Sequence, residues 1–110
     1  MNWVNHQYEI REVFLHIANE YKGNAIGGKI RQRIGVKPGV SDYFLPIPKG
    51  NYHGLWIELK RKKNAICSVN QKVWIEKMQN LGYAAYFCYG ADEAIKCIKT
   101  YMDIKPNAEI

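Results

Sequence analysis

Residues 53–60 decide the fold, and their sequence is His53-Gly54-Leu55-Trp56-Ile57-Glu58-Leu59-Lys60. Side chains of a β-strand point alternately to the two faces of a sheet. The three aliphatic residues of this stretch therefore face one way, and Trp56, Glu58 and Lys60 face the other. The pattern predicts a strand with one apolar face and a second face on which an acid lies beside a base, which is the first indication of a functional site.

A short strand and a turn are predicted upstream. Residues 43–47 favour a strand, and Pro46 and Pro48 indicate that it is short or lies at an edge of the sheet. The residues that follow it, Pro48-Lys49-Gly50-Asn51, are typical of a hairpin turn.

The first third of the chain is less regular. A helix is predicted from Trp3 to about Glu12, and residues 13–18 fit either its continuation or a short strand. Residues 29–34 favour a short basic helix that stops at Gly35.

A helix, a strand and a second helix are predicted downstream. Ser68 and Gln71 occupy the positions of a capping box, which opens a helix that ends at Gly82. Its apolar stripe is predicted to contain Val73, Trp74, Met78 and Leu81. Residues 83–88 are apolar on both faces, as in a central strand, and Gly90 begins the last helix. The result is an α/β fold in one domain spanning residues 1–110, with residues 103–110 as a frayed tail.

The composition is that of a globular protein with a basic surplus. Sixteen Lys and Arg outnumber ten Asp and Glu in 110 residues, which gives a net charge of +6. Such a surplus favours polyanionic partners, either nucleic acid or, less often, an anionic membrane surface. The basic residues gather in two runs, each of which a solvated face would also explain: Lys22, Lys29, Arg31, Arg33 and Lys37, and then Lys60-Arg61-Lys62-Lys63.

Location is inferred from what the sequence lacks. No stretch approaches the roughly 20 apolar residues of a membrane span, and the N-terminus has no secretory layout. Cys67, Cys88 and Cys97 include no C-x-x-C pair, so they favour reduced thiols over disulfides or a zinc site. We therefore expect a cytoplasmic protein.

Three residues of the predicted hairpin form a candidate catalytic constellation. Asp42 begins the first strand, and pairing of the strands brings it beside Glu58. Two facing carboxylates repel unless a cation neutralises them, and Mg²⁺ prefers such hard oxygen ligands. The main-chain carbonyl of Leu59 is a plausible third ligand. Lys60, on the same face as Glu58, is placed to orient a water and to offset charge on a phosphate, which suits metal-assisted hydrolysis of a phosphodiester.

Simpler interpretations remain open for each residue. An acid-x-Lys pair on a strand face is often a solvated ion pair. Asp42 follows Pro38-Gly39-Val40-Ser41 and also fits a turn. The capping box alone explains Gln71.

Four separated motifs follow one another along the chain. They are Gly39-Val40-Ser41-Asp42-Tyr43-Phe44-Leu45-Pro46, Tyr52 to Lys60, Ser68-Val69-Asn70-Gln71-Lys72-Val73-Trp74, and Leu81-Gly82-Tyr83. In this order they resemble the motifs of the VRR-NUC family, a branch of the PD-(D/E)xK nucleases. The resemblance extends from Asn19 to Met102, and the stand-alone members associated with viruses and phages are the most similar in size.

The resemblance implies a fold, a cofactor and a substrate. The fold would be restriction-endonuclease-like, a mixed β-sheet flanked by helices. The activity would depend on Mg²⁺ or Mn²⁺ and cleave branched DNA as a homodimer, in the manner of Holliday-junction resolvases, in the cytoplasm of a bacterial or phage-infected cell. By position, Asp42 matches the motif aspartate, Glu58 and Lys60 match the E-x-K pair, and Gln71 matches the glutamine of the next helix.

Three positions depart from the family pattern. Ser41 stands where proline is usual, and Asn19-Glu20-Tyr21 takes the place of an Asn-Gly-Gly stretch. The family also has a glutamate in an N-terminal helix upstream of the tryptophan that Trp3 matches, and the sequence begins too late to contain it. Glu9, Glu12 and Glu20 are candidate substitutes, and none matches cleanly.

The leading hypothesis is therefore a metal-dependent DNA endonuclease. The alternatives are a non-catalytic nucleic-acid-binding module on the same fold, and an assembly protein whose basic face contacts an acidic partner. Trp3, Val4 and Tyr8 are the candidate dimer contacts.

Overall fold

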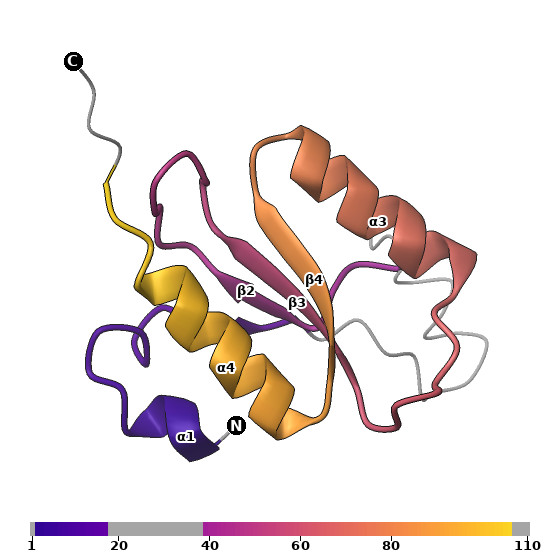
Figure 1. Cartoon of the computed structure of the whole chain (residues 1–110), viewed down its shortest axis with the longest axis horizontal. Coiled ribbons are helices and arrows are strands. Elements are labelled where there is room, and N and C mark those ends of the chain that lie inside the picture. The colour runs from indigo at the N-terminus through magenta and orange to yellow at the C-terminus, as the bar shows by residue number, and fades with distance from the viewer. Residues whose placement is uncertain (1, 18–38, 107–110) are drawn as a thin grey trace, which may run out of the picture.

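The computed structural model describes residues 2–17 and 39–106, which form one sheet with helices on both faces (Figure 1). In chain order the elements are α1 (Asn2–Asn5), β1 (Leu15–His16), β2 (Tyr43–Leu45), β3 (Leu55–Lys60), α3 (Val69–Asn80), β4 (Ala84–Tyr89) and α4 (Ala91–Met102).

The sheet is mixed and its strands lie in the order β1-β2-β3-β4. β1 pairs with β2, and β2 with β3, in the antiparallel sense, whereas β3 and β4 are parallel. Parallel neighbours need a crossover connection, and α3 provides it. The predicted α/β class, with a mixed sheet flanked by helices, is confirmed.

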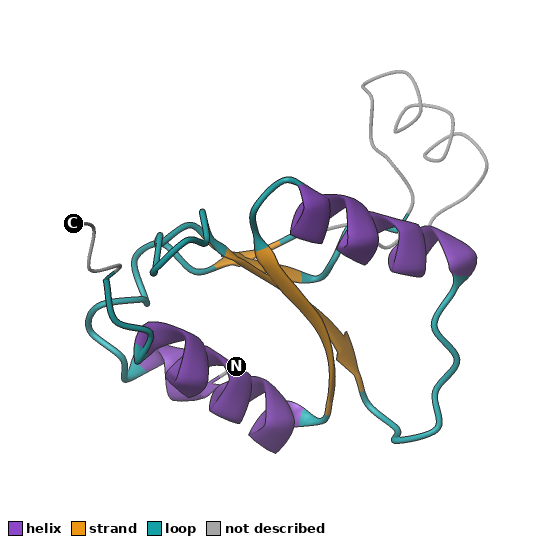
Figure 2. Ribbon diagram, turned by 45° about the horizontal axis from the view of Figure 1, so that its top comes forward, coloured by secondary structure: helices purple, strands orange, loops and turns teal. Residues whose placement is uncertain are grey.

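The alternation along β3 divides the protein into two layers, as Figure 2 shows with the sheet between α3 on one side and α4 and α1 on the other. Leu55 and Ile57, at most 1% exposed, join the larger core against α4. Burial of such aliphatic side chains stabilises the fold by roughly 1.5–3 kcal/mol each. Trp56 packs on the other face against Trp74 of α3, with ring centroids 5.3 Å apart. The predicted face of Trp56, Glu58 and Lys60 is therefore the α3 face.

The N-terminal predictions are partly correct. α1 ends at Asn5, and hydrogen-bonded turns rather than one long helix continue to Phe14. Of residues 13–18, Leu15 and His16 form a strand, since they pair with β2. Val4 is 5% exposed and belongs to the core, so it is not available as a dimer contact. The predicted helix at residues 29–34 lies outside the described residues.

One strand prediction is confirmed and one needs correction. β2 is short, which is one of the two predicted alternatives, and the other alternative, an edge position, does not apply because β1 pairs with its outer side. β4 was predicted to be central, yet in the described part of the sheet it is the outer strand. Its side chains are apolar on both faces because α3 covers one face and α4 the other.

The helices begin where their caps predict. α3 has both hydrogen bonds of the Ser68–Gln71 capping box, and it ends at Asn80, with Leu81 as its C-cap and the predicted Gly82 directly after it. Its inward stripe differs from the predicted one: Ile75 and Met78 are buried, whereas Val73 and Leu81 are 43% and 61% exposed.

α4 buries three residues of its inner face: Ala94, Ile98 and Tyr101. The frayed tail expected from residue 103 is not met at Asp103 and Ile104, which continue the hydrogen bonding of α4, and Ile104 also packs on the core. At 12 residues each, α3 and α4 are too short to cross a bilayer, and no other helix in the described ranges could do so.

Candidate active site

The candidate site lies where the pairing of β2 and β3 ends. The last observed pair is Tyr43 with Ile57, so the same register places Asp42 opposite Glu58. Residues directly opposed in antiparallel strands have Cα atoms about 4.5–5.5 Å apart. The predicted approach of these two residues therefore follows from the register that the structure has.

The side chain of Asp42 forms the last hydrogen bond between the β2 segment and β3. Its Oδ2 accepts a hydrogen bond of 2.9 Å from the backbone N–H of Leu59, in the place where a carbonyl of a longer β2 would act. Its own backbone carbonyl accepts from Ile17 N–H at 2.7 Å, which ties it to the end of β1. Asp42 is thus held from both sides, with its carboxylate against β3.

The carbonyl of Leu59 points to the same side of β3 as Asp42. Backbone groups of successive strand residues point to alternate sides, and the Lys60 carbonyl accepts from Gly90 N–H at 2.7 Å on the β4 side. The N–H and C=O of Leu59 must therefore both point toward the β2 side. The Leu59 carbonyl, which was predicted as a main-chain metal ligand, therefore points toward the side of β3 on which Asp42 lies.

Glu58 is the buried acid of the site. Its side chain is 4% exposed and faces α3, between Trp56 and Lys60 on the same side of β3. Burial of a carboxylate is costly unless positive charge or hydrogen bonds compensate it. A carboxylate is also a hard oxygen donor of the kind that a divalent cation prefers.

Lys60 of β3 and Gln71 of α3 form a hydrogen bond between the sheet and the helix. Lys60 Nζ donates to Gln71 Oε1 at 2.6 Å, and Ser68 N–H donates to the same oxygen at 3.0 Å. Gln71 therefore has two roles in the structure, since it completes the helix cap and contacts the ammonium group of Lys60.

Gly39 allows the loop before Asp42 to lie against the first turn of α3. Its φ is +85°, and an added Cβ would lie 2.5 Å from the backbone carbon and oxygen of Asn70. Only glycine fits this position without displacing the loop or the helix. The sequence analysis interpreted Pro38-Gly39 only as part of a turn and did not predict this contact. The glycine beside the proline was the one signal in the sequence that could have indicated it.

The pKa of Tyr43 is affected by charged residues around the site. Burial, and then the negative charge of Asp42, raise the pKa of Tyr43, whereas the positive charge of Arg61 opposes the shift. Arg61 begins the exposed basic segment 61–63 that directly follows β3. One of the two predicted basic runs thus adjoins the site, and the other lies outside the described residues.

The candidate substitutes for a third acid do not join the site. Glu9 lies with Trp3, Lys99 and Met102 beside α4, which is on the opposite face of the sheet. Glu12 is exposed and lies 3.6 Å from the guanidinium of Arg11. Glu20 and the Asn19-Glu20-Tyr21 stretch lie outside the described residues. Within residues 2–17 and 39–106, no three His, Cys, Asp or Glu side chains come together as a metal cluster.

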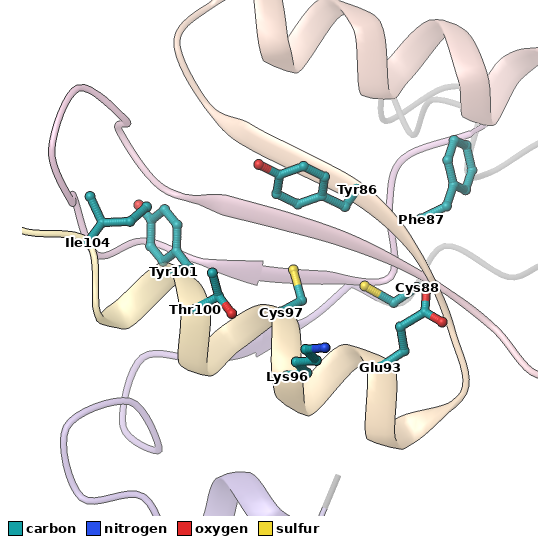
Figure 3. Close-up of a pocket in the computed structure, with 9 residues that line it drawn as sticks. All are labelled: Tyr86, Phe87, Cys88, Glu93, Lys96, Cys97, Thr100, Tyr101 and Ile104. Atoms are coloured by element: carbon teal, nitrogen blue, oxygen red, sulfur yellow. The ribbon is translucent and has the colours of Figure 1, made fainter.

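A hollow of about 320 Å³ lies on the other face, between β4 and α4 (Figure 3). Cys88 and Cys97 line it as free thiols, and Cys88 packs in the core. Their mutual hydrogen bond and burial raise the pKa of Cys88, whereas the same hydrogen bond lowers the pKa of Cys97 against the opposing effect of burial. Because Glu58 and Lys60 face α3, this hollow is separate from the candidate site.

Comparison with known proteins gives a consistent result. The model of the VRR-NUC domain family matches residues 2–92. A solved structure described as a VRR_NUC domain protein is similar to the chain at 30% identity and a TM-score of 0.81, covering 96% of this chain and 84% of that one. No curated protein matches the chain.

Proposed function

Since the chain belongs to the VRR-NUC family and therefore has a nuclease-type domain, we propose that it is a metal-dependent endonuclease that hydrolyses phosphodiester bonds in branched DNA. The observation that supports this proposal is that the register places Asp42 opposite Glu58, while Lys60, on the same face of β3 as Glu58, contacts Gln71 of α3.

Asp42, Glu58 and the carbonyl of Leu59 are the proposed metal ligands. Two carboxylates and a carbonyl are hard oxygen donors, which fit Mg²⁺ or Mn²⁺ better than a softer metal. The bound ion would supply Lewis-acid activation of a phosphate oxygen or of water. The N–H of Leu59 occupies one oxygen of Asp42 and leaves the second oxygen for the metal.

Lys60 is the proposed catalytic cation. Its ammonium group donates up to three hydrogen bonds, of which Gln71 accepts one. The others are available to a water or to a phosphate oxygen on which negative charge develops. Gln71 accepts a hydrogen bond from this group on the α3 face of β3, which also bears Glu58, and it is the fourth residue of the proposed site.

The proposed substrate is DNA with a junction or another branch. The net charge of +6 and the exposed segment 61–63 beside the site favour binding to backbone phosphates without sequence readout. We further propose a homodimer, because two sites related by symmetry suit paired cuts in a junction of matching symmetry. Its proposed location is the cytoplasm of a bacterial or phage-infected cell, where the three free thiols stay reduced.

A specific observation favours a second candidate. No third acidic side chain joins Asp42 and Glu58 within the described ranges. The same fold without sufficient metal affinity would be a nucleic-acid-binding module. Junction binding without nicking at enzyme excess over hours, in Mg²⁺ and in Mn²⁺, would support that alternative.

The decisive experiment compares labelled flap, fork, four-way and linear DNA with Mg²⁺ or Mn²⁺ on a denaturing gel. We expect cleavage of a branched substrate that EDTA abolishes and that Asp42→Ala with Lys60→Ala removes. The matched control, Asp92→Ala with Lys96→Ala on exposed positions of α4, should retain cleavage. Undiminished cleavage by the Asp42/Lys60 double variant would show that the chemistry is assigned to the wrong residues.

A further inference from the structure

The side-chain oxygen of Gln71 accepts hydrogen bonds from two different parts of the fold. Lys60 Nζ on β3 donates at 2.6 Å, and the backbone N–H of Ser68, the N-cap of α3, donates at 3.0 Å. A carbonyl oxygen has two lone pairs, so both are used. The orientation of the amide is thereby determined, because its nitrogen end has no lone pair to offer to either donor.

Ser68 holds Gln71 by its backbone as well as by its side chain. Ser68 Oγ accepts from the N–H of Gln71 at 3.1 Å, while the N–H of Ser68 donates to the side chain of Gln71. A free glutamine side chain samples many rotamers. The reciprocal cap selects the rotamer that directs Oε1 toward Lys60.

The cap is itself attached to the sheet at the level of Lys60. Cys67, the residue before Ser68, has its Sγ 3.5 Å from the hydroxyl of Tyr89. Tyr89 is the β4 register partner of Lys60. The N-terminus of α3 is therefore anchored beside the residue that Gln71 contacts.

We propose that Ser68 is a positioning residue for the nuclease reaction and that it acts on Lys60 through Gln71. The inference rests on the proposed function, because it assigns a role in that same site. Without the hydroxyl of Ser68, the N-cap loses its bond to the backbone N–H of Gln71. The N-cap backbone is then less firmly fixed, so the Ser68 N–H that directs Gln71 Oε1 confines the Gln71 side chain less strictly. Lys60 then loses its fixed acceptor, and its ammonium group is less often in the productive place.

Single-turnover cleavage of a branched DNA at saturating enzyme and Mg²⁺ tests the chemical step. We expect Ser68→Ala to lower the rate constant about tenfold, as displacement of a catalytic group does, with DNA affinity unchanged. Ser68→Thr keeps the cap oxygen and should restore the rate to within about threefold of the wild type. Failure of Ser68→Thr to restore what Ser68→Ala loses would overturn the proposal.

A double-mutant cycle with Gln71→Ala tests the route of the effect. If Ser68 acts through Gln71, adding Ser68→Ala to Gln71→Ala changes the rate less than about twofold. Additive losses would overturn the proposal. Ile75→Val, which loosens the packing of the same helix without touching the cap, is the matched control and should leave the rate unchanged.

A spectrum of the DNA-free protein separates this inference from the proposed function. The side-chain amide signal of Gln71 in a ¹H–¹⁵N NMR spectrum should move toward that of a free glutamine in Ser68→Ala and in Lys60→Met, and not in Ile75→Val. If the wild type cleaves no DNA, the proposed function fails, and the amide signal still tests the link between the three residues. If cleavage is robust and Ser68→Ala changes neither rate nor signal, the inference alone fails.

Discussion

The hydroxyl of Ser41 is fully buried and has no hydrogen-bond partner among the described residues. A buried polar atom left without a partner costs about 1–3 kcal/mol. The family pattern has proline at this position, which carries no side-chain donor. Among the described residues nothing offsets this cost, so we expect the serine to be a destabilising departure immediately before Asp42.

Replacing Ser41 by alanine should raise the free energy of unfolding. We expect a gain of about 1 kcal/mol, because the buried hydroxyl is removed and the space left is only one oxygen atom in size. Urea titration of both proteins measures it, with equal m-values as the control that both unfold in the same way. A loss of stability would show that the hydroxyl is bonded outside the described residues.

Tyr101 makes stability depend on pH above 10. Its side chain is 2% exposed and its hydroxyl donates to the Ile47 carbonyl at 2.6 Å. Burial raises the pKa of Tyr101 to about 12, from 10.0. The native protein thus retains a proton that the unfolded chain loses, so its stabilising contribution is complete below pH 10 and is lost as pH rises to about 12.

The test is the free energy of unfolding of wild type and Tyr101→Phe between pH 9 and pH 12. Phenylalanine lacks the ionisable group, so we expect a shallower decline for the variant in this range, although its stability at pH 9 is lower by the lost hydrogen bond. Parallel declines would contradict the assignment to Tyr101.

At the scale of elements, the sequence predicted features that depend on a few neighbouring residues better than it predicted how the strands pair. The alternation along residues 55–60 predicted both faces of β3, and Ser68 with Gln71 predicted the start of α3, because each signal lies within a few neighbouring residues. The outer position of β4 was not predictable, since apolar side chains on both faces report helix coverage and not the number of strand neighbours. The exposed Val73 and the buried Ile75 show the same limit for α3.

In the candidate site, too, local features were predictable from the sequence and contacts between distant segments were not. The common face of Glu58 and Lys60 follows from strand period, whereas two contacts between distant segments do not follow from any local pattern. These are the bond from Leu59 N–H to Asp42, 17 residues away, and that from Lys60 to Gln71, 11 residues away. A further contact, the approach of Gly39 to Asn70, also could not be predicted from a local pattern, because it depends on how the loop packs against the helix.

Gly39→Ala tests this contact between elements. The new Cβ would lie 2.5 Å from the Asn70 backbone at a φ that disfavours any side chain, so the loop before Asp42 must move away from α3. We expect DNA cleavage to fall at least tenfold, as misplacement of a catalytic group does, and stability to fall by about 1–3 kcal/mol.

Gly90→Ala is the matched control for this glycine. Gly90 also has a positive φ, of +95°, but no atom lies within 4 Å of an added Cβ. This variant should lose stability through backbone strain and retain cleavage. Equal loss of cleavage in both variants would mean that strain, and not the contact with α3, is responsible.

At the scale of the whole molecule, the two faces of the sheet carry different kinds of residue. The α4 face carries the larger core, which includes the N-terminal segment, and the α3 face carries the candidate catalytic groups. The exposed residues Arg61, Lys62 and Lys63 continue directly from the strand that bears those groups. Phosphates bound there would adjoin the site, whereas basic residues on α4 lie across the sheet from it.

Salt dependence of DNA binding separates these two sets of charges. Each phosphate contact contributes about −0.9 to the slope of log K against log salt concentration. Arg61→Ala with Lys62→Ala should therefore make the slope less negative by up to about 1.8. Lys96→Ala with Lys105→Ala lowers the net charge from +6 to +4 by the same amount, but at exposed positions on α4 and beyond it, so the slope should stay close to that of the wild type. Fluorescence anisotropy with a labelled four-way junction across a salt series measures both slopes. Because net charge is matched, equal slopes in the two variants would show that general attraction governs binding, and that the segment after β3 does not hold the DNA backbone.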